Sequence, residues 1–421
     1  MRKIYLILLL GVAPTLFFSC HKDSHKVDPV LITTPASNIT MSTAVSGGSF
    51  TTDGTLPIVS TGIEYDTGSS FPNHWTATGG SGIGTFSADL SGLWPNTRYY
   101  IRAFATGIDS SPYYGNILQF TTIYVPSKYK VITVAGTGAA GSTNGDTSMA
   151  SFNQPDAVAV DASGNMYVAD SKNNAIRKIT PGGTVTTFAT LNATPFDLVL
   201  DNSGNVYVTA SNFEILMITP GGQVSTFAGT GVSGHADGTG TAAAFYQPIT
   251  IDIDPAGNLY VADLSSFRKI SPGGVVSTLP AFSAVGSCYG VAVDKNFNLY
   301  ESSSYTVIKV DSSGTESVLA GNGQPGSADG TGTAASFGSI EEIRVDAAGN
   351  VYAADFSNYK VRLISPSGVV TTFAGTGAAG SMDGNAAIAT FNGVSGLGVD
   401  NGGNIYVADE NNNKIRKILP L

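Results

Sequence analysis

Six copies of one short motif divide most of the chain into units of similar length. Each copy runs Asp-x-x-Gly-Asn, an apolar residue and Tyr, except that Phe297 replaces the Gly in the fourth. The copies begin at Asp161, Asp201, Asp254, Asp294, Asp346 and Asp400, at spacings of 40, 53, 40, 52 and 54 residues. Units of about 40 to 50 residues are typical of propeller blades, each a four-stranded sheet. The chain is therefore expected to form six such sheets.

Each unit divides into four short strands joined by two recognisable turns. In the first unit the expected strands are 157–160, 165–170, 175–179 and 184–189. Asp-x-x-Gly-Asn suits the hairpin between the first two, because Asp and Asn bond to nearby backbone and Gly tolerates a positive φ. Pro-Gly-Gly recurs between the last two strands, at 181–183, 220–222 and 272–274. The Asp motif lacks the bidentate Glu of a calcium loop, which favours a turn.

These units resemble NHL repeats, and residues 130–421 resemble a six-bladed NHL β-propeller. The fourth unit departs most, since Glu-Ser-Ser at 301–303 replaces the usual Val-Ala-Asp. Residues 130–136 match a fourth strand, and 414–418 match a third strand. We therefore expect the first of these segments to complete the last blade, which closes the ring and removes two exposed edges.

Ahead of the repeats, residues 29–124 contain alternating β-type runs separated by Gly and Ser clusters, which suits a β-sandwich. The tract LWPNTRYYIRAFA, at 93–105, resembles the fibronectin type III pattern around its tyrosine corner. The resemblance implies a domain that spaces or presents its neighbour. His74 and Trp75 lie between two runs and are either a sugar-stacking platform or, as is commoner for a loop Trp, structural cover. Residues 125–129 are the expected linker.

The N-terminus has the layout of a bacterial lipoprotein signal. Two basic residues precede an apolar run at 4–18, which is short for a membrane span. The ending LFFSC resembles the lipobox, whose cysteine is lipidated and becomes the mature N-terminus. Residues 1–19 are thus the expected signal peptide, Cys20 the lipid anchor and 20–28 a tether, at the outer membrane or surface of the cell envelope. Cys288 is then expected to be a small buried apolar residue.

Charge and composition exclude several functions. Twenty-one basic against 31 acidic residues give a net charge of -10, which makes nucleic acid an unexpected partner. Four histidines and two cysteines without C-x-x-C do not make a Cys/His zinc site. Neither G-x-S-x-G nor H-E-x-x-H occurs. Lyases that resemble this propeller depend on histidine-bound zinc, whereas the repeats here contain only His235.

Four of the unit junctions carry a Gly-rich insertion that begins G-x-G-x-x-G. These insertions start at Gly136, Gly229, Gly321 and Gly375. Dinucleotide-binding turns share the spacing, but they require a helix after the third glycine. Each insertion instead leads to A-x-F and a strand, so no nucleotide is expected. The phenylalanines, which are Phe152, Phe245, Phe337 and Phe391, are expected to plug the space between blades.

The first strand of each unit is expected to lie next to the axis of the ring, where space is short, yet some of these strands contain charged residues. Most units place small residues there, such as Ala159 and Gly398. Units 2, 3 and 5 instead place Asp197, Thr250, Asp252, Glu342 and Arg344 at these positions. Two interpretations stay open. The residues form a structural ion pair, for example Asp252 with Arg344, in a watery channel, or they line a ligand or Ca²⁺ site.

The preferred function is non-catalytic binding of a protein or glycan. Connections between blades, and between the second and third strands, emerge on one face, where the variable loops gather. The predicted ligand-binding residues are Asp156, Asp197, His235, Asp252, Glu341, Glu342 and Arg344. Accompanying loop residues are Asn173, Asn174, Asp237, Asp329, Asp383, Asn411 and Asn412. The alternative is a Ca²⁺-dependent hydrolase or lyase with Asp197, Asp252 and Glu342 as catalytic residues, but no complete catalytic set is visible.

Overall fold

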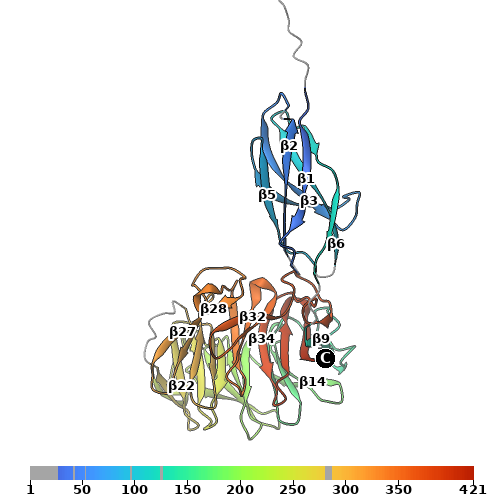
Figure 1. Ribbon diagram of the computed structural model, residues 1–421. Coiled ribbons are helices and arrows are strands. Elements are labelled where there is room, and N and C mark those ends of the chain that lie inside the picture. The colour runs from blue at the N-terminus through green and yellow to red at the C-terminus, as the bar shows by residue number, and fades with distance from the viewer. Residues whose placement is uncertain (1–26, 41–42, 53, 95–96, 124–126, 280–286) are drawn as a thin grey trace, which may run out of the picture. The chain divides into compact units, whose positions relative to one another are not determined.

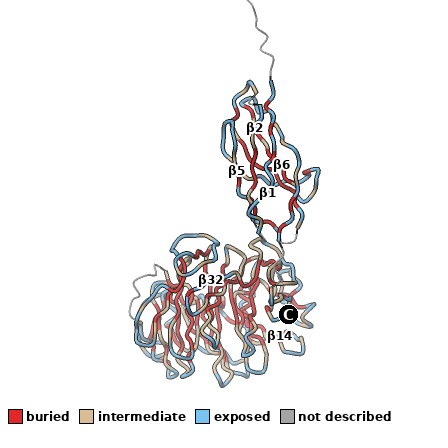
Figure 2. The backbone as a smooth tube through the Cα atoms, viewed as in Figure 1, coloured by how far each residue is buried: buried red, intermediate tan, exposed pale blue. Residues whose placement is uncertain are grey.

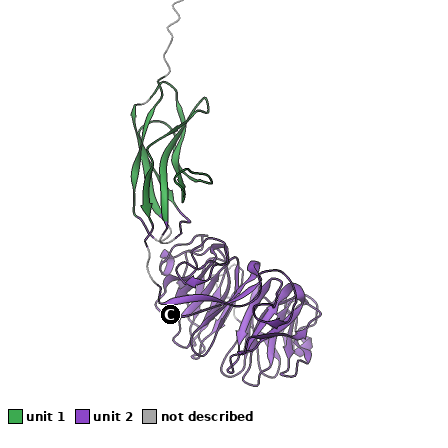
Figure 3. Ribbon diagram, turned by 90° about the vertical axis from the view of Figure 1, so that its right-hand side faces the viewer, with its two compact units in different colours: residues 1–38, 44–90, 98–121 green, residues 39–43, 91–97, 122–421 purple. Residues whose placement is uncertain are grey.

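The structure is a computed structural model that describes residues 27–40, 43–52, 54–94, 97–123, 127–279 and 287–421. The chain divides into two compact units, of residues 1–38, 44–90 and 98–121 and of residues 39–43, 91–97 and 122–421 (Figure 3). The predicted signal peptide and Cys20 lie outside the described residues. Within the described part, no helix is both long and apolar enough to span a membrane.

The first unit consists of two antiparallel sheets. One has the order β1-β2-β5, from β1 (Val30–Ser37), β2 (Ala44–Thr52) and β5 (Thr85–Leu90). The other has the order β4-β3-β6-β7, from β4 (Trp75–Gly80), β3 (Ile58–Asp66), β6 (Arg98–Gly107) and β7 (Pro112–Tyr114), and β8 (Leu118–Thr121) also pairs with β6. Alternate residues of β6, including Tyr99 and Ile101, are buried between the sheets. Pro95 of the tyrosine-corner tract is not described.

The second unit contains six antiparallel sheets, named here sheet 1 to sheet 6 (Figure 1). Sheet 1 contains β11 (Pro155–Val160), β12 (Met166–Asp170), β13 (Ala175–Ile179), β14 (Thr184–Thr190) and β10 (Gly145–Asp146). Sheet 2 contains β15 (Pro195–Leu200), β16 (Val206–Ala210), β17 (Glu214–Ile218) and β18 (Val224–Ala228). Sheet 3 contains β20 (Thr250–Ile253), β21 (Leu259–Asp263), β22 (Ser266–Ile270), β23 (Val275–Thr278) and β19 (Gly238–Thr239). Sheet 4 contains β24 (Gly290–Val293), β25 (Leu299–Ser302), β26 (Val307–Val310) and β27 (Glu316–Ala320). Sheet 5 contains β29 (Ile340–Val345), β30 (Val351–Asp355), β31 (Lys360–Ile364), β32 (Val369–Ala374) and β28 (Gly330–Thr331). Sheet 6 contains β34 (Val394–Val399), β35 (Ile405–Asp409), β36 (Lys414–Pro420), β9 (Tyr129–Ala135) and β33 (Gly384–Asn385).

The six sheets form a closed ring. The first strand of each sheet contacts the first strand of the next, and β34 of sheet 6 contacts β11 of sheet 1. The predicted closure is confirmed, because β9 pairs antiparallel with β36, with Val131 opposite Ile418. The N-terminal strand of the unit thus supplies the fourth strand of its last sheet and covers an edge that would otherwise be free.

The core of the ring lies between neighbouring sheets, where the strands are largely buried (Figure 2). The insertion phenylalanines Phe152, Phe245, Phe337 and Phe391 are all fully buried. Phe152, for example, packs with residues of sheet 1 and with Tyr406 and Ala408 of sheet 6. The predicted plugs between sheets are therefore confirmed.

The Asp motif makes the predicted turn. In the first copy the Asp161 carboxylate accepts hydrogen bonds from the backbone of Ser163 and Asn165, at 2.9 and 2.8 Å. Gly164 has a φ of 81°, which glycine adopts at little cost. Phe297 takes the same place in the fourth copy with a φ of 63°, so the turn survives without glycine but with a strained residue.

Candidate functional site

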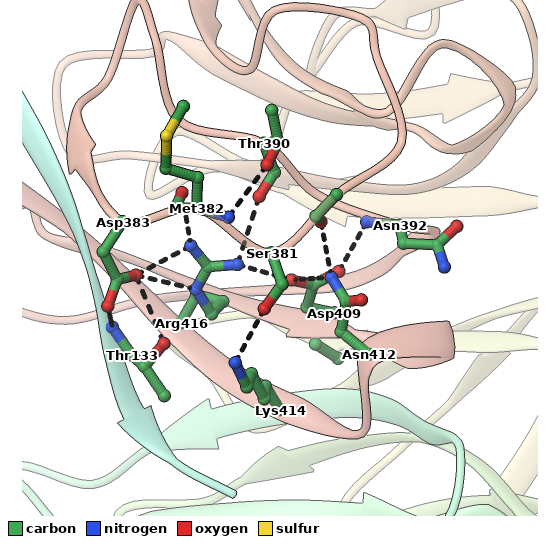
Figure 4. Close-up of polar contacts among 12 residues, drawn as sticks. Thr133, Ser381, Met382, Asp383, Thr390, Asn392, Asp409, Asn412, Lys414 and Arg416 are labelled. Carbon is green, nitrogen blue, oxygen red and sulfur yellow. Dashed lines mark hydrogen bonds and ion pairs between the residues drawn. The ribbon is translucent and has the colours of Figure 1, made fainter. Parts of the chain in front are cut away.

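A buried arginine fastens the Gly-rich insertion to sheet 6 (Figure 4). Arg416, on β36, binds Asp409 at the end of β35 at 2.6 Å and Asp383 of the insertion at 2.7 Å. Its two terminal nitrogens also donate to the carbonyl oxygens of Thr390 and Met382. Asp409 is itself held by the Asn392 amide and the Asn412 side chain. A buried charge is tolerated when its partners saturate it in this way.

Three more sheets contain the same arrangement, called the arginine clamp below. The arginine, its strand-end aspartate and its insertion residue are Arg177, Asp170 and Asn144 in sheet 1; Arg268, Asp263 and Asp237 in sheet 3; and Arg362, Asp355 and Asp329 in sheet 5. Each insertion also adds a two-residue fifth strand to its sheet, as β33 does beside β9. Among the residues that the structure describes, which exclude 280–286 before sheet 4, sheets 2 and 4 have neither a clamp nor a fifth strand.

The insertions and the second-to-third connections share one face, called the loop face below. The side-chain amide of Asn412, in the short helix η5 (Glu410–Asn412), donates to Gly380 of the insertion at 2.7 Å, and Asn173 makes the same bond to Gly141. The predicted common face is therefore confirmed. Several loop residues that we expected to be available for a ligand are instead engaged within the fold, because Asp383, Asp329 and Asp237 bind clamp arginines.

A charged cluster lies in the centre of the ring. The Arg344 guanidinium, from sheet 5, binds Asp197 of sheet 2 at 2.8 Å and also contacts Glu342. Its other terminal nitrogen donates to the Ile251 carbonyl at 3.2 Å. The ion pair that we suggested, Asp252 with Arg344, is not the direct one: the Asp252 oxygens accept from the Val293 and Ile253 amides. The cluster therefore links first strands from different sheets.

Calcium does not fit this cluster. One oxygen of Asp197 and one of Glu342 face the Arg344 guanidinium, which stands where a cation would. Their other oxygens accept from the Ile251 and Leu397 amides at 2.8 and 2.7 Å. Among the described residues, no three His, Cys, Asp or Glu side chains are arranged to hold a metal ion. The carboxylates that we considered as Ca²⁺ ligands are therefore committed to arginine and backbone.

Burial dominates the electrostatics of the cluster. It raises the pKa of Asp197, of Asp252 and, most of all, of Glu342, and the positive charge of Arg344 opposes the rise in each case. Three carboxyls share one guanidinium, so full ionisation would leave a buried excess of negative charge. Proton uptake by Glu342 relieves that excess.

A cavity of about 270 Å³ opens on the loop-face side of this cluster. Asp156, Glu341 and Glu410 line it together with the rings of Phe196 and Phe356. The floor is formed by Asp197 and Glu342 of the central cluster. The structure thus brings together four of the predicted ligand-binding residues, Asp156, Asp197, Glu341 and Glu342.

The rim of this cavity is negatively charged and partly protonated near neutrality. Burial raises the pKa of Asp156 to about 7, and the charges of Glu410 and Glu341 add to the rise. Burial and the Glu341 charge likewise raise the pKa of Glu410. Lys172 opposes both shifts, but within the described part of the chain no cation lies in ion-pair contact with Asp156, Glu341 or Glu410. The rim therefore lacks a charge-neutralising partner.

The remaining predicted residues lie elsewhere. Asp252 and Arg344 line a second cavity of about 260 Å³ with apolar walls of Val158 and Leu198. His235, on the sheet 3 insertion, stacks on Tyr246 with ring centroids 5.2 Å apart and does not line either cavity. In the first unit the prediction that Trp75 lies in a loop is wrong: it begins β4, opposite Tyr65 of β3, is half exposed and stacks on the Tyr65 ring.

Sequence reasoning missed Phe196, Phe356 and Glu410. Phe196 lies at the start of β15, whereas Phe356 and Glu410 lie in short connections, and only the fold brings the three together. It also missed the clamp arginines. They did have a signal: in three sheets an Asp at the end of the second strand is followed seven residues later by Arg. A charge recurring at a fixed position in apolar third strands indicates a repeated buried ion pair.

Two stretches of the ring match a known repeat. Residues 152–179 and 391–418, in sheets 1 and 6, match the NHL repeat. Each stretch spans a plug phenylalanine, the first three strands and the clamp arginine. These two stretches of the ring are therefore similar to NHL repeats.

Similar proteins extend this comparison. A protein of unknown function from Bacteroides thetaiotaomicron has 19% identity and a TM-score of 0.58, and the match covers 94% of this chain and 98% of that one. An auxiliary nutrient binding protein from Bacteroides ovatus has 18% identity, the same TM-score and the same coverage. "Protein SUPPRESSOR OF QUENCHING 1, chloroplastic" of Arabidopsis thaliana is 26% identical over 323 residues, 68% of this chain but only 27% of that protein. At these identities the solved structures show a shared fold.

Proposed function

We propose that this chain is a non-catalytic binding protein that holds a basic group of a protein or peptide ligand at the loop-face cavity. The observation that carries the proposal is the acidic cavity itself: Asp156, Glu341 and Glu410 surround a space flanked by Phe196 and Phe356. A lysine or arginine side chain supplies the positive charge that this rim lacks, and aromatic faces attract cations as well. A neutral glycan supplies no such charge, so of the two predicted ligand classes, protein and glycan, the cavity favours a protein or peptide.

The central cluster supports binding over catalysis. A hydrolase using Asp197, Asp252 and Glu342 needs carboxylate oxygens free for a metal or a water. Those oxygens instead contact Arg344 and backbone amides. The cluster gives the cavity a rigid floor. That solved structures of similar fold include auxiliary nutrient binding proteins is also in keeping with a binding role.

In the full proposal, a six-bladed NHL propeller follows a fibronectin type III-like sandwich, and lipid on Cys20 anchors the chain to the bacterial outer membrane or cell surface. The supporting features are the basic, apolar and small-residue order at the N-terminus and the tyrosine-corner tract. The experiment is detergent partitioning of the processed protein and of a Cys20→Ala form. The anchor predicts that this variant accumulates as precursor, and normal processing of the variant would contradict it.

The binding proposal is tested with two dye-labelled probes, tetralysine and tetraglutamate, by fluorescence anisotropy. The protein should bind tetralysine and not tetraglutamate, and Glu341→Gln with Glu410→Gln should weaken tetralysine binding at least tenfold. The control pair, Asp89→Asn with Asp146→Asn, changes the net charge equally at exposed residues that are not among the cavity-lining residues. Equal losses in both double variants would show that only overall charge matters and would refute the site.

A further inference from the structure

The second cavity lies at the end of the ring centre that is opposite the loop face. Each first strand begins at the loop face and ends at its Asp turn, so the six Asp turns share the other face, called the turn face below. The cavity of about 260 Å³ that Asp252 and Arg344 line opens at these strand ends. It shares no lining residue with the loop-face cavity. The two cavities are therefore separate.

Six aliphatic side chains, one from each sheet, surround the turn-face cavity. Each is the last residue of a first strand and directly precedes the Asp of the turn. These residues, called the aliphatic collar below, are Val160, Leu200, Ile253, Val293, Val345 and Val399. All except Val293 are only half-buried. Apolar surface left accessible around a cavity favours a ligand that covers it with apolar groups of its own.

Asp252 supplies the polar group of this cavity. Its two carboxylate oxygens accept hydrogen bonds from the Ile253 and Val293 amides, at 2.9 and 2.8 Å. Within the described part of the chain, no Lys, Arg or His lies in ion-pair contact with it. Each carboxylate oxygen can accept a further hydrogen bond. Asp252 is therefore able to bind a donor that enters the cavity.

The charge balance favours a cationic donor over an anionic ligand. Asp252 and the carboxyls of Asp197 and Glu342 surround one guanidinium, so a bound cation reduces the excess of negative charge and a bound anion adds to it. The terminal nitrogens of Arg344 already donate to Asp197 and to the Ile251 carbonyl. Lys295 lines a neighbouring depression and is not among the residues that line this cavity.

The size of the cavity limits the ligand to a few carbon atoms. Sites for drug-sized ligands have volumes of about 300–1,000 Å³, above the 260 Å³ found here. The deeper walls are the fully buried side chains of Val158 and Leu198. A short alkyl chain that ends in an ammonium group matches both the walls and the carboxylate.

We propose that the turn-face cavity binds a small aliphatic primary amine, whose ammonium group donates to Asp252 and whose alkyl chain contacts the aliphatic collar. This site is independent of the proposed loop-face site, because it lies on the opposite face and uses other residues. It takes a free small molecule, whereas the loop-face cavity takes a basic side chain of a protein or peptide.

The proposal is tested by isothermal titration calorimetry of the full chain at pH 7 with ethylamine, propylamine, butylamine and, as the anionic counterpart, butyrate. The three amines should bind, and each added methylene should tighten binding about fourfold, since burying one is worth about 0.8 kcal/mol. Butyrate should not bind. No amine binding, equal affinity for the three amines, or butyrate binding as tight as that of butylamine would overturn the proposal.

Two variants locate the site. Val399→Phe narrows the collar and keeps the carboxylate, and Asp252→Asn removes the charge and keeps the collar. Each should weaken butylamine binding at least tenfold. Val224→Phe, at an exposed valine that does not line the cavity, is the control for the first variant and should bind butylamine normally. Unchanged butylamine binding in folded Val399→Phe or folded Asp252→Asn would overturn the proposal.

The loop-face double variant, Glu341→Gln with Glu410→Gln, separates this proposal from the proposed function. It should bind butylamine as the parent protein does while losing affinity for tetralysine. If it loses butylamine binding, the amine occupies the loop-face cavity and the turn-face site is refuted, without contradiction of the proposed function. This comparison needs no change at the turn face, so it decides even if Val399→Phe and Asp252→Asn fail to fold.

Discussion

Sheets 4 and 6 have the same strand order but handle buried charge in opposite ways. In sheet 6, Arg416 and Asp409 are both fully buried, and every charged group has several partners. In sheet 4, Ile308 takes the place of the arginine, and the Glu301 carboxyl has no hydrogen-bond partner among the residues that the structure describes. The difference shows that the four strands alone do not require a clamp. The clamp belongs with the insertion, which it fastens onto the loop face.

This comparison also explains which sheets support the candidate site. Glu410 and Phe356, on the cavity rim, belong to connections of sheets 6 and 5, both of which have clamps. Sheet 4 contributes no residue to that rim. The rim therefore combines connections of the clamped sheets 5 and 6 with Phe196 of sheet 2, which has no clamp.

The largest effect is expected from removing the strand that completes sheet 6. A chain that starts at Gly136 loses β9, and with it the partner of both β36 and β33. Compared with a chain that starts at Ser127, we expect loss of a cooperative transition, or a melting temperature at least about 10 °C lower, and self-association. Calorimetry and light scattering measure both. Equal melting temperatures and monomeric behaviour would contradict the closure by β9.

Breaking the clamp should be the next most damaging change. Arg416→Met leaves the buried Asp409 carboxylate without its counter-charge, which costs about 3–5 kcal/mol when one partner of a buried pair is removed. Urea unfolding at pH 7 measures the loss. Lys414→Met is the control, because among the described residues the Lys414 ammonium donates only to the exposed Ser381 hydroxyl. If both variants lose less than about 1 kcal/mol, the clamp is not a major source of stability.

Removing the buried Glu301 carboxyl of sheet 4 should change the stability in the opposite direction. Glu301→Val restores the residue found in sheets 1, 2, 3 and 6, and we expect it to stabilise the protein in urea unfolding by roughly 4–5 kcal/mol at pH 8, because the carboxyl must stay protonated in the folded state. Because the folded-state pKa of Glu301 is raised to about 9, its stability contribution falls as pH rises above about 4.5. The gain should therefore shrink at pH 5. A gain that is the same at both pH values would argue that packing, not ionisation, is responsible.

The smallest effect is expected at the exposed end of the clamp. Asp383 is about half exposed and bonds to Arg416 and Thr133, so solvent screens its ion pair. Asp383→Asn keeps the side-chain shape and should cost about 0.2–1 kcal/mol in urea unfolding. A loss as large as that of Arg416→Met would mean that the insertion contact, and not the buried pair with Asp409, carries the clamp.

The repeat predicted the order of strands in the ring, the Asp turn and the closure, because turn chemistry and strand period are local properties of the sequence. It also marked residues 301–303 as the departure in sheet 4. The pairing of the charged residues in the centre of the ring could not be predicted. Arg344 binds Asp197 and not Asp252, because strand register and the width of the ring decide the distances across the centre. Two residues of the cavity rim, Asp156 and Glu341, could be predicted because they lie near the start of the first strands of their sheets. Glu410 could not, because it comes from a connection whose path is set by the clamp.

The central claim, that the loop-face cavity binds a basic group, is tested most directly by the pH dependence of tetralysine binding to the protein and to Asp156→Asn. A bound cation favours the ionised form of Asp156, whose pKa in the free protein is raised to about 7. Affinity should therefore increase about tenfold from pH 6 to pH 8 in the parent protein and stay constant in the variant. Binding that does not change with pH in the parent protein, or that changes equally in both proteins, would contradict the claim.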